Sequence, residues 1–307
     1  MNKPSNYAPV LVFAYRRPEH LKNTLSSLMR CEGFSESPII IYGDGPRDSG
    51  EVDTVEATRE IARSMLGEKA DYRFNETNLG LARSVIRGVT ETVHRFDRVI
   101  VVEDDLQLSP SFLSYMNKAI DRYAKNDRVF QVSGYMFDVP ETRHSQRAMF
   151  LPLTVSWGWA TWKRAWEHFD PLASGWEGLR TDKKLRRRFN LNGAYDYAAM
   201  LIRQMRGEQD SWAIRWYWSV FKKNGIVLFP PVSLVRNYGM DGSGSHGRGR
   251  LRRFAAGPVV TDAHGFVLPD AVQLDPRRWE SVRKAIWRMN GGWVIRSADW
   301  IRSRFRN

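Results

Sequence analysis

The sequence predicts an α/β fold in which helices flank a mostly parallel central sheet. Over the first 140 residues, short runs rich in β-branched residues alternate with segments whose apolar residues recur at helical spacing. This alternation is typical of parallel strands joined by crossover helices. The run Val-Ile-Val-Val at 99–102 is apolar on both faces, as expected of a central strand. With 307 residues, 42% of them hydrophobic, the chain can bury a full core.

The elements of this half follow in chain order. Strands are expected at 10–15, 39–42, 72–74, 99–102 and 129–134. Pro18 suits the first turn of the helix that follows the first strand, and Asp48 with Glu51 resembles a capping box ahead of the second helix. Asn78 is expected to cap a third helix. Residues 109–110, Ser-Pro, are expected to open a fourth.

The alternation stops near residue 140, and tryptophan becomes frequent at 156–166 and 210–218. We expect this half to shape a cleft rather than to extend the sheet. Residues 239–250 are polar and rich in glycine, which is typical of a loop. We therefore expect one domain over residues 1–275 and a basic amphipathic helical tail over residues 276–307.

Basic residues are concentrated in this tail. The net charge is +13, and residues 276–307 hold nine Lys and Arg against two acidic residues. Trp279, Val282, Ile286, Met289 and Trp293 recur at spacings of three and four, which predicts the apolar stripe of an amphipathic helix. Such a helix suits an anionic membrane surface. The alternative is a helix docked on the main domain.

Other features bear on where the protein works. Cys31 is the single cysteine, so no internal disulfide can form and no thiolate cluster can bind zinc. The first residues lack the basic start and apolar run of a signal peptide, and no stretch reaches the roughly 18 to 20 apolar residues of a membrane span. We expect a cytoplasmic protein with peripheral contact at the inner face of the membrane.

Three consecutive carboxylates, Glu103, Asp104 and Asp105, follow the expected central strand. Open α/β sheets bind ligands at the carboxyl ends of their strands. Crowded carboxylates repel one another unless a cation compensates them, and oxygen ligands suit Mg²⁺ or Mn²⁺. Such an ion often takes one or two carboxylates and completes its shell with phosphate oxygens and water. The pattern predicts a metal and diphosphate site; the alternative is a solvated strand end.

The segment VIVVEDDLQLSPSFLSYM resembles the corresponding part of the GT-A glycosyltransferases and is most similar to the N-acetylglucosaminyltransferase I enzymes. Matching segments occur in order from residue 9 to residue 246. The resemblance implies a GT-A, Rossmann-like fold with residues 1–275 as its catalytic domain. It also implies these contacts: Arg17 with the nucleotide base, Asp44 with the base or ribose, Glu103 with the donor sugar, Asp104 with the ribose and Asp105 with the metal ion.

The resemblance continues into the second half. The segment QDSW is similar to the motif that holds the family's catalytic base, which implies this role for Asp210. A helix cap is the alternative for an aspartate at this position. In NLGLARS, Arg83 is expected to approach the donor, and an ordinary surface position on a helix is its alternative.

Two further segments match loops around the donor. SWGW matches a loop beside the donor sugar, which implies that Trp157 and Trp159 line that pocket, whereas a tryptophan belongs in the core by default. GSGSH matches a loop that folds over the nucleotide, which implies contacts of Ser245 and His246 with the diphosphate or metal.

The resemblance implies an inverting, metal-dependent hexosyl- or N-acetylhexosaminyltransferase that uses a UDP-sugar. The acceptor would be a hydroxyl of a glycan or lipid-linked saccharide, and we expect a role in bacterial surface polysaccharide synthesis. One alternative is a nucleotidyltransferase with the same carboxylates, although no glycine-rich phosphate loop follows the first strand. Another is a basic nucleic-acid binding protein, which the carboxylates disfavour.

Overall fold

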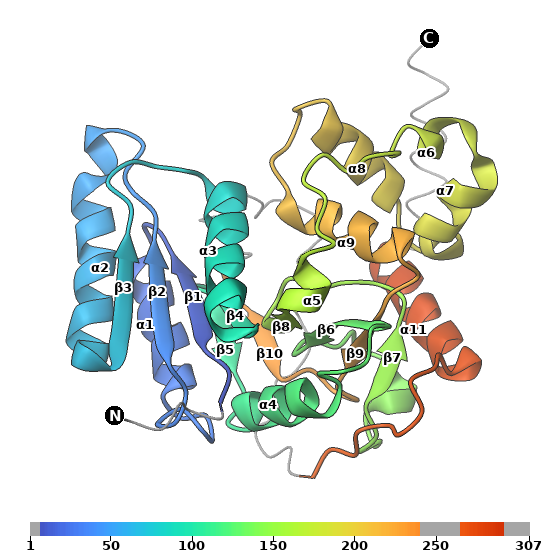
Figure 1. The fold of residues 1–307 in the computed structure, drawn as a ribbon, viewed down its shortest axis with the longest axis horizontal. Coiled ribbons are helices and arrows are strands. Elements are labelled where there is room, and N and C mark those ends of the chain that lie inside the picture. Colours follow the sequence, from blue (N-terminus) through green and yellow to red (C-terminus); the bar gives the residue numbers. More distant parts are fainter. Residues whose placement is uncertain (1–6, 240–264, 292–307) are drawn as a thin grey trace.

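The computed structural model describes residues 7–239 and 265–291. Its centre is an eight-stranded sheet with the order β3-β2-β1-β4-β8-β6-β9-β7, beside a two-stranded sheet of β10 and β5 (Figure 1). The strands are β1 Val10–Ala14, β2 Ile39–Gly43, β3 Ala70–Phe74, β4 Arg98–Glu103, β5 Leu106–Leu108, β6 Val129–Ser133, β7 Met149–Leu151, β8 Trp159–Trp162, β9 Ile226–Phe229 and β10 Val235–Asn237. The longer helices are α1 Pro18–Leu28, α2 Val52–Leu66, α3 Leu81–Phe96, α4 Phe112–Arg122, α8 Tyr197–Met205, α9 Trp212–Lys222 and α11 Pro276–Met289, and the short ones are α5 Lys163–Trp166, α6 Gly178–Thr181 and α7 Lys183–Phe189.

The predicted α/β fold with a mostly parallel sheet is confirmed. β1 to β4 are parallel, with Val12 of β1 in register with Ile41 of β2 and Val102 of β4. β6 and β9 run in the same direction, while β7 and β8 run against it. The five strands predicted in the first half are present to within two residues at each end. All residues of β1 and β2 are buried, as expected of strands covered on both faces.

The second half also contributes strands, so the expectation that it would not extend the sheet is wrong. β8 inserts between β4 and β6, and its four residues are all buried. β7 and β9 complete the sheet on the far side of β6. These strands hold only three or four residues each, which is too short for a periodic pattern to stand out. Gly158, at φ 59°, makes the turn that leads into β8.

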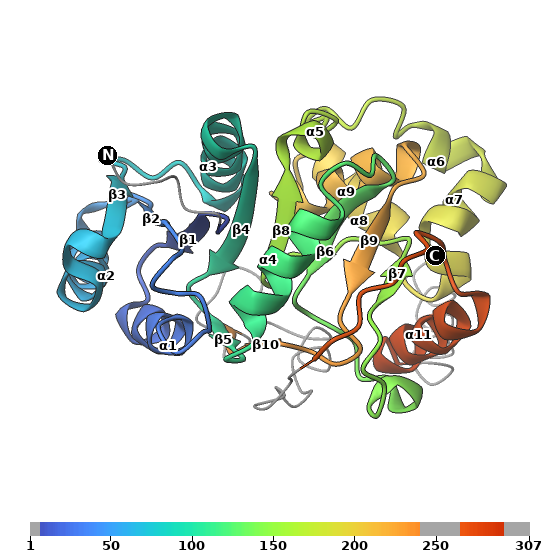
Figure 2. The same cartoon turned by 60° about the horizontal axis from the view of Figure 1, so that its bottom comes forward.

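Helices cover both faces of the sheet. α1 and α4 lie along one face, and α3 and α5 lie along the other (Figure 2). α3 begins at Leu81 with Gly80 as its N-cap, at φ 80°, a conformation that favours glycine. Asn78, which was predicted to be this cap, instead donates a hydrogen bond to the carbonyl of Gly45 at 2.9 Å.

The described part of the predicted tail is α11, which packs on the rest of the protein. Val282, Ala285 and Ile286 are buried, and Asn290 Nδ2 donates to the carbonyl of Ala194 at 3.4 Å. α11 therefore has the docked arrangement, with Arg277, Lys284 and Arg288 exposed. Within the described ranges, none of the helices combines the length and apolarity that a membrane crossing requires.

Candidate active site

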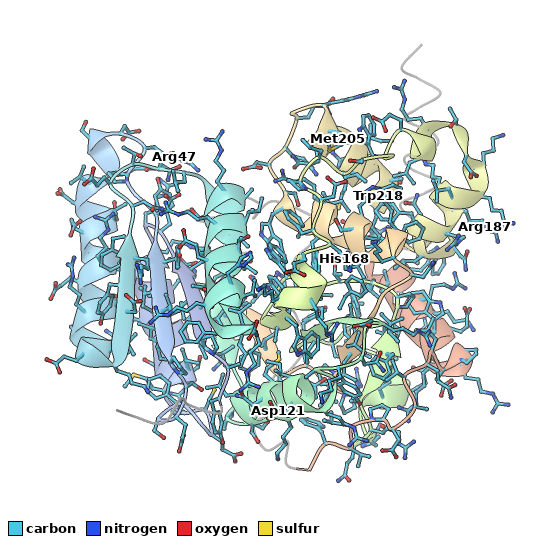
Figure 3. The ribbon with its side chains drawn as sticks, viewed as in Figure 1. Arg47, Asp121, His168, Arg187, Met205 and Trp218 are labelled. Carbon is cyan, nitrogen blue, oxygen red and sulfur yellow. The ribbon has the colours of Figure 1, made fainter. Side chains whose placement is uncertain are left out.

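A pocket of about 350 Å³ lies at the carboxyl ends of β1, β2 and β4 and extends to the second half of the chain. Arg47, labelled in Figure 3, lines it on the β2 side. Two sides differ in chemistry. We call one side the charged wall: Arg16, Arg17, Asp44, Arg47, Glu103, Asp104 and Asp105. We call the other side the aromatic wall: Tyr135, Trp157, Tyr195, Tyr197 and Met200.

In the predicted carboxylate triplet, Glu103 ends β4 and the two aspartates form the turn after it, and all three line the pocket. We call these three residues the carboxylate turn. Burial, followed by repulsion from Asp105 and Asp104, raises the pKa of Glu103 to about 8. Burial also raises the pKa of Asp104 to about 6, although the positive charge of Arg17 opposes this shift. Burial thus disfavours the charged form of both carboxyl groups, and the neighbouring acids add to this effect.

Arg17 follows β1 and is the counter-ion of this turn. Its guanidinium pairs with Asp104 and, at 3.1 Å, with Asp105 Oδ2. Burial opposes the charge of Arg17, but the two carboxylates outweigh burial and raise its pKa above the ordinary value. Its Nη1 is buried and has no hydrogen-bond partner among the described residues. If Arg17 contacts a nucleotide base as predicted, Nη1 is the nitrogen left to donate to it, because Nε and Nη2 donate to the carboxylates.

Asp105 is fixed by residues from a distant part of the chain. β10 pairs antiparallel with β5, and Asn237 Nδ2 donates to Asp105 Oδ1 at 3.2 Å. The backbone N–H of Tyr238 donates to the Asp105 carbonyl at 2.8 Å. A Cβ on Gly239 would lie 2.0 Å from Asp105 Oδ2, so glycine permits this close approach.

The charge of the turn fits a divalent cation. Arg17 pairs with Asp104 and Asp105, and the third carboxylate, that of Glu103, lies beside them. No three His, Cys, Asp or Glu side chains of residues 7–239 and 265–291 form a ready-made cation cage. An ion could nevertheless take one or two of these carboxylates and complete its shell with phosphate oxygens and water.

Asp44, predicted to lie near the base or ribose, holds the loop that precedes α3. Its Oδ1 accepts from the backbone N–H of Leu79, and its Oδ2 accepts from that of Gly80, both at 2.9 Å. Oδ1 also accepts from the N–H of Gly45 at 3.0 Å and from Asn75 Nδ2 at 3.3 Å. These hydrogen bonds hold the loop before α3 in place at the edge of the pocket.

Asp210 lies between the two walls, just before α9. Ser211 is the N-cap of α9 and accepts from the N–H of Ile214, so the helix-cap alternative for Asp210 is wrong. Arg215 pairs with Asp210 at 3.4 Å. An ideal Cβ on Gly80 would lie 3.9 Å from Asp210 Oδ2, which places this carboxylate opposite the start of α3. An exposed carboxylate facing a pocket is suited to accept a proton.

The other predicted residues have different outcomes. Trp157 is half-buried and lines the pocket. Trp159 is fully buried in β8, where it stacks on Trp212 with ring centroids 5.2 Å apart, and so belongs to the core. Arg83 is exposed on α3 outside the pocket lining, because its neighbours Ala82 and Ser84 take the inward positions. Ser245 and His246 lie outside the described residues.

Sequence reasoning missed several residues of the pocket. Tyr15 and Asn75 directly follow β1 and β3 and could have been found from their place at the carboxyl edge. Asn237 gave no such signal, because it reaches Asp105 across 132 positions. Apart from Trp157, the aromatic wall was missed because its members come from separate segments whose packing no local pattern reveals.

A mostly parallel sheet with a carboxylate turn at the end of its central strand is the fold of the GT-A glycosyltransferases. The model of glycosyl transferase family 2 matches residues 10–206, which is 197 of the 307 residues. The chain therefore belongs to glycosyl transferase family 2. The matched region contains the charged wall and ends shortly before Asp210.

Proposed function

We propose that this glycosyltransferase is an inverting, metal-dependent enzyme that moves a hexose or N-acetylhexosamine from a UDP-sugar to a glycan hydroxyl. The observation that carries the proposal is the placement of Asp210 and the carboxylate turn on one pocket. The carboxylate turn supplies negatively charged oxygens for a cation, and that cation can bind the diphosphate. Asp210 supplies a base. The resemblance of the acidic segment to N-acetylglucosaminyltransferase I supports uridine as the base of the donor.

In the proposed reaction, Asp210 accepts the proton of the acceptor hydroxyl while that oxygen attacks the anomeric carbon of the donor. The bond to the diphosphate breaks in the same step, so the configuration of the sugar inverts and no covalent glycosyl-enzyme forms. Arg215 pairs with Asp210 at 3.4 Å and holds its carboxylate at the pocket. Arg17 keeps the carboxylate turn in place.

Asp105 is the residue proposed to hold Mn²⁺ or Mg²⁺, with Asn237 orienting its carboxylate. A divalent cation bound there would stabilise the negative charge that develops on the departing diphosphate. Glu103 and Asp104 are proposed to contact the donor sugar and ribose from the same turn.

We also propose that the acceptor belongs to bacterial surface polysaccharide synthesis and that the enzyme works at an anionic membrane face. The exposed cations Arg277, Lys284 and Arg288 on α11 support this contact. Co-sedimentation with anionic vesicles tests it: we expect binding that falls when these three residues are replaced by Glu. If the triple variant binds the vesicles as well as the unmodified protein does, α11 does not contact the membrane through these cations and this proposal is wrong.

The donor proposal is tested by thermal shift with a panel of nucleotide sugars, with and without Mn²⁺. We expect one UDP-sugar to raise the melting temperature only when Mn²⁺ is present, because a ligand stabilises the folded state to which it binds. Asp105→Ala is expected to abolish this shift. Asp121→Ala is the matched control, since Asp121 lies on α4, away from the pocket (Figure 3). No shift with any donor would contradict the proposal.

A further inference from the structure

Helix α7 and the turn before it carry a dense group of cations outside the pocket. Residues 180–188 hold six Lys and Arg against one Asp, and none of them lines the pocket. The acid is Asp182, which is the N-cap of α7 and accepts from the backbone N–H groups of Lys184 and Leu185. The segment is therefore strongly positive.

Four of these cations are exposed and form no ion pair with the described acidic side chains. We call them the α7 cations: Arg180, Lys183, Lys184 and Arg187. The other two are engaged, because Arg186 pairs with Asp196 at 3.8 Å and Arg188 Nη2 donates to Asn224 Oδ1 at 3.3 Å. Lys183 and Arg187 lie four positions apart on the helix, where like charges repel. An anionic surface outside the protein would relieve this repulsion.

The opposite side of α7 is fixed to the wall of the pocket. Phe189, at the end of the helix, is fully buried and stacks on Tyr217 with ring centroids 4.6 Å apart. The hydroxyl of Tyr217 also donates to the carbonyl of Phe189 at 3.0 Å. Because Tyr217 lines the pocket, α7 is joined to the pocket through one layer of packed rings. A partner bound to the α7 cations would lie at a fixed position relative to the pocket.

α7 and α11 lie at the same end of the molecule (Figure 1 and Figure 2). Arg187, labelled in Figure 3, lies at the outer edge of this end. The hydrogen bond from Asn290 to the carbonyl of Ala194 connects the end of α11 to the segment that follows α7. Two basic helices at one end present cations over a wide area, as contact with an extended anionic partner requires.

The side chains around α7 favour a membrane over a nucleic acid. Single-stranded nucleic acids stack their bases on exposed aromatic rings. The rings of residues 176–189 are those of Trp176 and Phe189, and both pack against the core. Leu172, in the loop that leads to α6, instead leaves 72% of its surface exposed. Exposed apolar side chains near a group of cations suit the interface of an anionic bilayer.

We propose that the α7 cations bind the phosphate headgroups of an anionic membrane and make the larger contribution to membrane binding, with α11 contributing beside them. This inference rests on the membrane contact proposed above and names the surface that makes most of it. Binding of the donor does not involve α7, because the α7 cations lie outside the pocket lining.

The test is co-sedimentation of the whole chain with phosphatidylcholine vesicles that contain about one third phosphatidylglycerol, compared with vesicles of phosphatidylcholine alone. We expect binding only to the anionic vesicles, weakened by salt. The triple variant Lys183→Glu, Lys184→Glu and Arg187→Glu is expected to bind roughly 100-fold more weakly, because it removes three cations from the contact. The α11 variant with Glu at 277, 284 and 288 should lose less.

The matched control is the triple variant Lys22→Glu, Arg30→Glu and Lys118→Glu. It changes the net charge by the same amount, and its three positions are exposed on α1, just after α1 and on α4, outside the pocket lining. The control should bind the anionic vesicles nearly as well as the unmodified protein does. If it loses as much affinity as the α7 variant, net charge alone governs binding and the inference is wrong.

The remaining outcomes separate this inference from the other proposals. If the α11 variant loses binding and the α7 variant keeps it, the role of α7 is wrong and the α11 contact stands. If the unmodified protein binds an oligonucleotide and no vesicle, the partner is a nucleic acid and both membrane proposals are wrong. The thermal shift with UDP-sugar and Mn²⁺ should be the same in the α7 variant as in the unmodified protein. A loss of that shift would show that α7 supports the pocket, contrary to the inference.

Discussion

The two walls of the pocket are built from largely different parts of the chain and in different ways. The charged wall consists of residues at or shortly after the ends of parallel strands, held by ion pairs such as that of Arg17 with Asp105. The aromatic wall consists of residues from loops and from α8, held by ring packing such as that of Tyr197 on Tyr217. Strand ends are suited to bind phosphate and metal, whereas packed rings are suited to a less charged ligand.

The largest expected effect lies where the walls meet. Asp210→Asn keeps the size of the side chain and removes its ability to accept a proton. We expect the rate of sugar transfer to fall by about 10²- to 10⁴-fold, the usual contribution of a general base. The affinity for UDP and Mn²⁺ is expected to stay the same, because the charged wall is intact. Steady-state kinetics and calorimetric titration with UDP measure the two quantities.

The control for this variant is Glu208→Gln, because Glu208 lies two residues away and pairs with Arg206 at 3.8 Å without lining the pocket. Its transfer rate should match that of the unmodified enzyme. If Asp210→Asn keeps more than a tenth of the rate, Asp210 is not the base. If the affinity for UDP falls together with the rate, Asp210 contacts the donor rather than the acceptor.

The charged wall could largely be predicted from the sequence. β1, β2 and β4 are apolar runs followed by polar residues, so Arg17, Asp44 and Asp105 could be assigned to one sheet edge from strand order alone. What the sequence could not supply is which groups these side chains contact. Asp44 turned out to bind backbone N–H groups of residues 79 and 80, because the fold brings that loop to it.

The aromatic wall could not be predicted to the same degree. Trp157 and Trp159 are separated by one glycine, yet the first lines the pocket and the second is fully buried. Residues two apart in an ordinary strand would share a face. Here Gly158, at φ 59°, reverses that relation, and β8 begins only at Trp159. The orientation of each ring therefore depends on tertiary packing rather than on a local pattern.

A smaller effect is expected at Asp44, which belongs to the charged wall. Asp44→Ala removes the acceptor of the Leu79 and Gly80 N–H groups, each at 2.9 Å. We expect the free energy of unfolding to fall by about 1 to 2 kcal/mol, since partly buried donors left without partners are costly. Urea denaturation measures this change. The affinity for UDP should fall only slightly, because the change acts on it only through the loop that Asp44 holds in place.

The matched control is Asp48→Ala, because Asp48 is an exposed N-cap that accepts from the Gly50 N–H at 2.9 Å. Its loss should cost about 1 kcal/mol, as is typical of a cap. If Asp44→Ala instead leaves stability unchanged and abolishes UDP binding, the carboxylate contacts the nucleotide directly. The charged wall would then bind the donor through its base as well as through the carboxylate turn, and the backbone bonds of Asp44 would serve only to orient it.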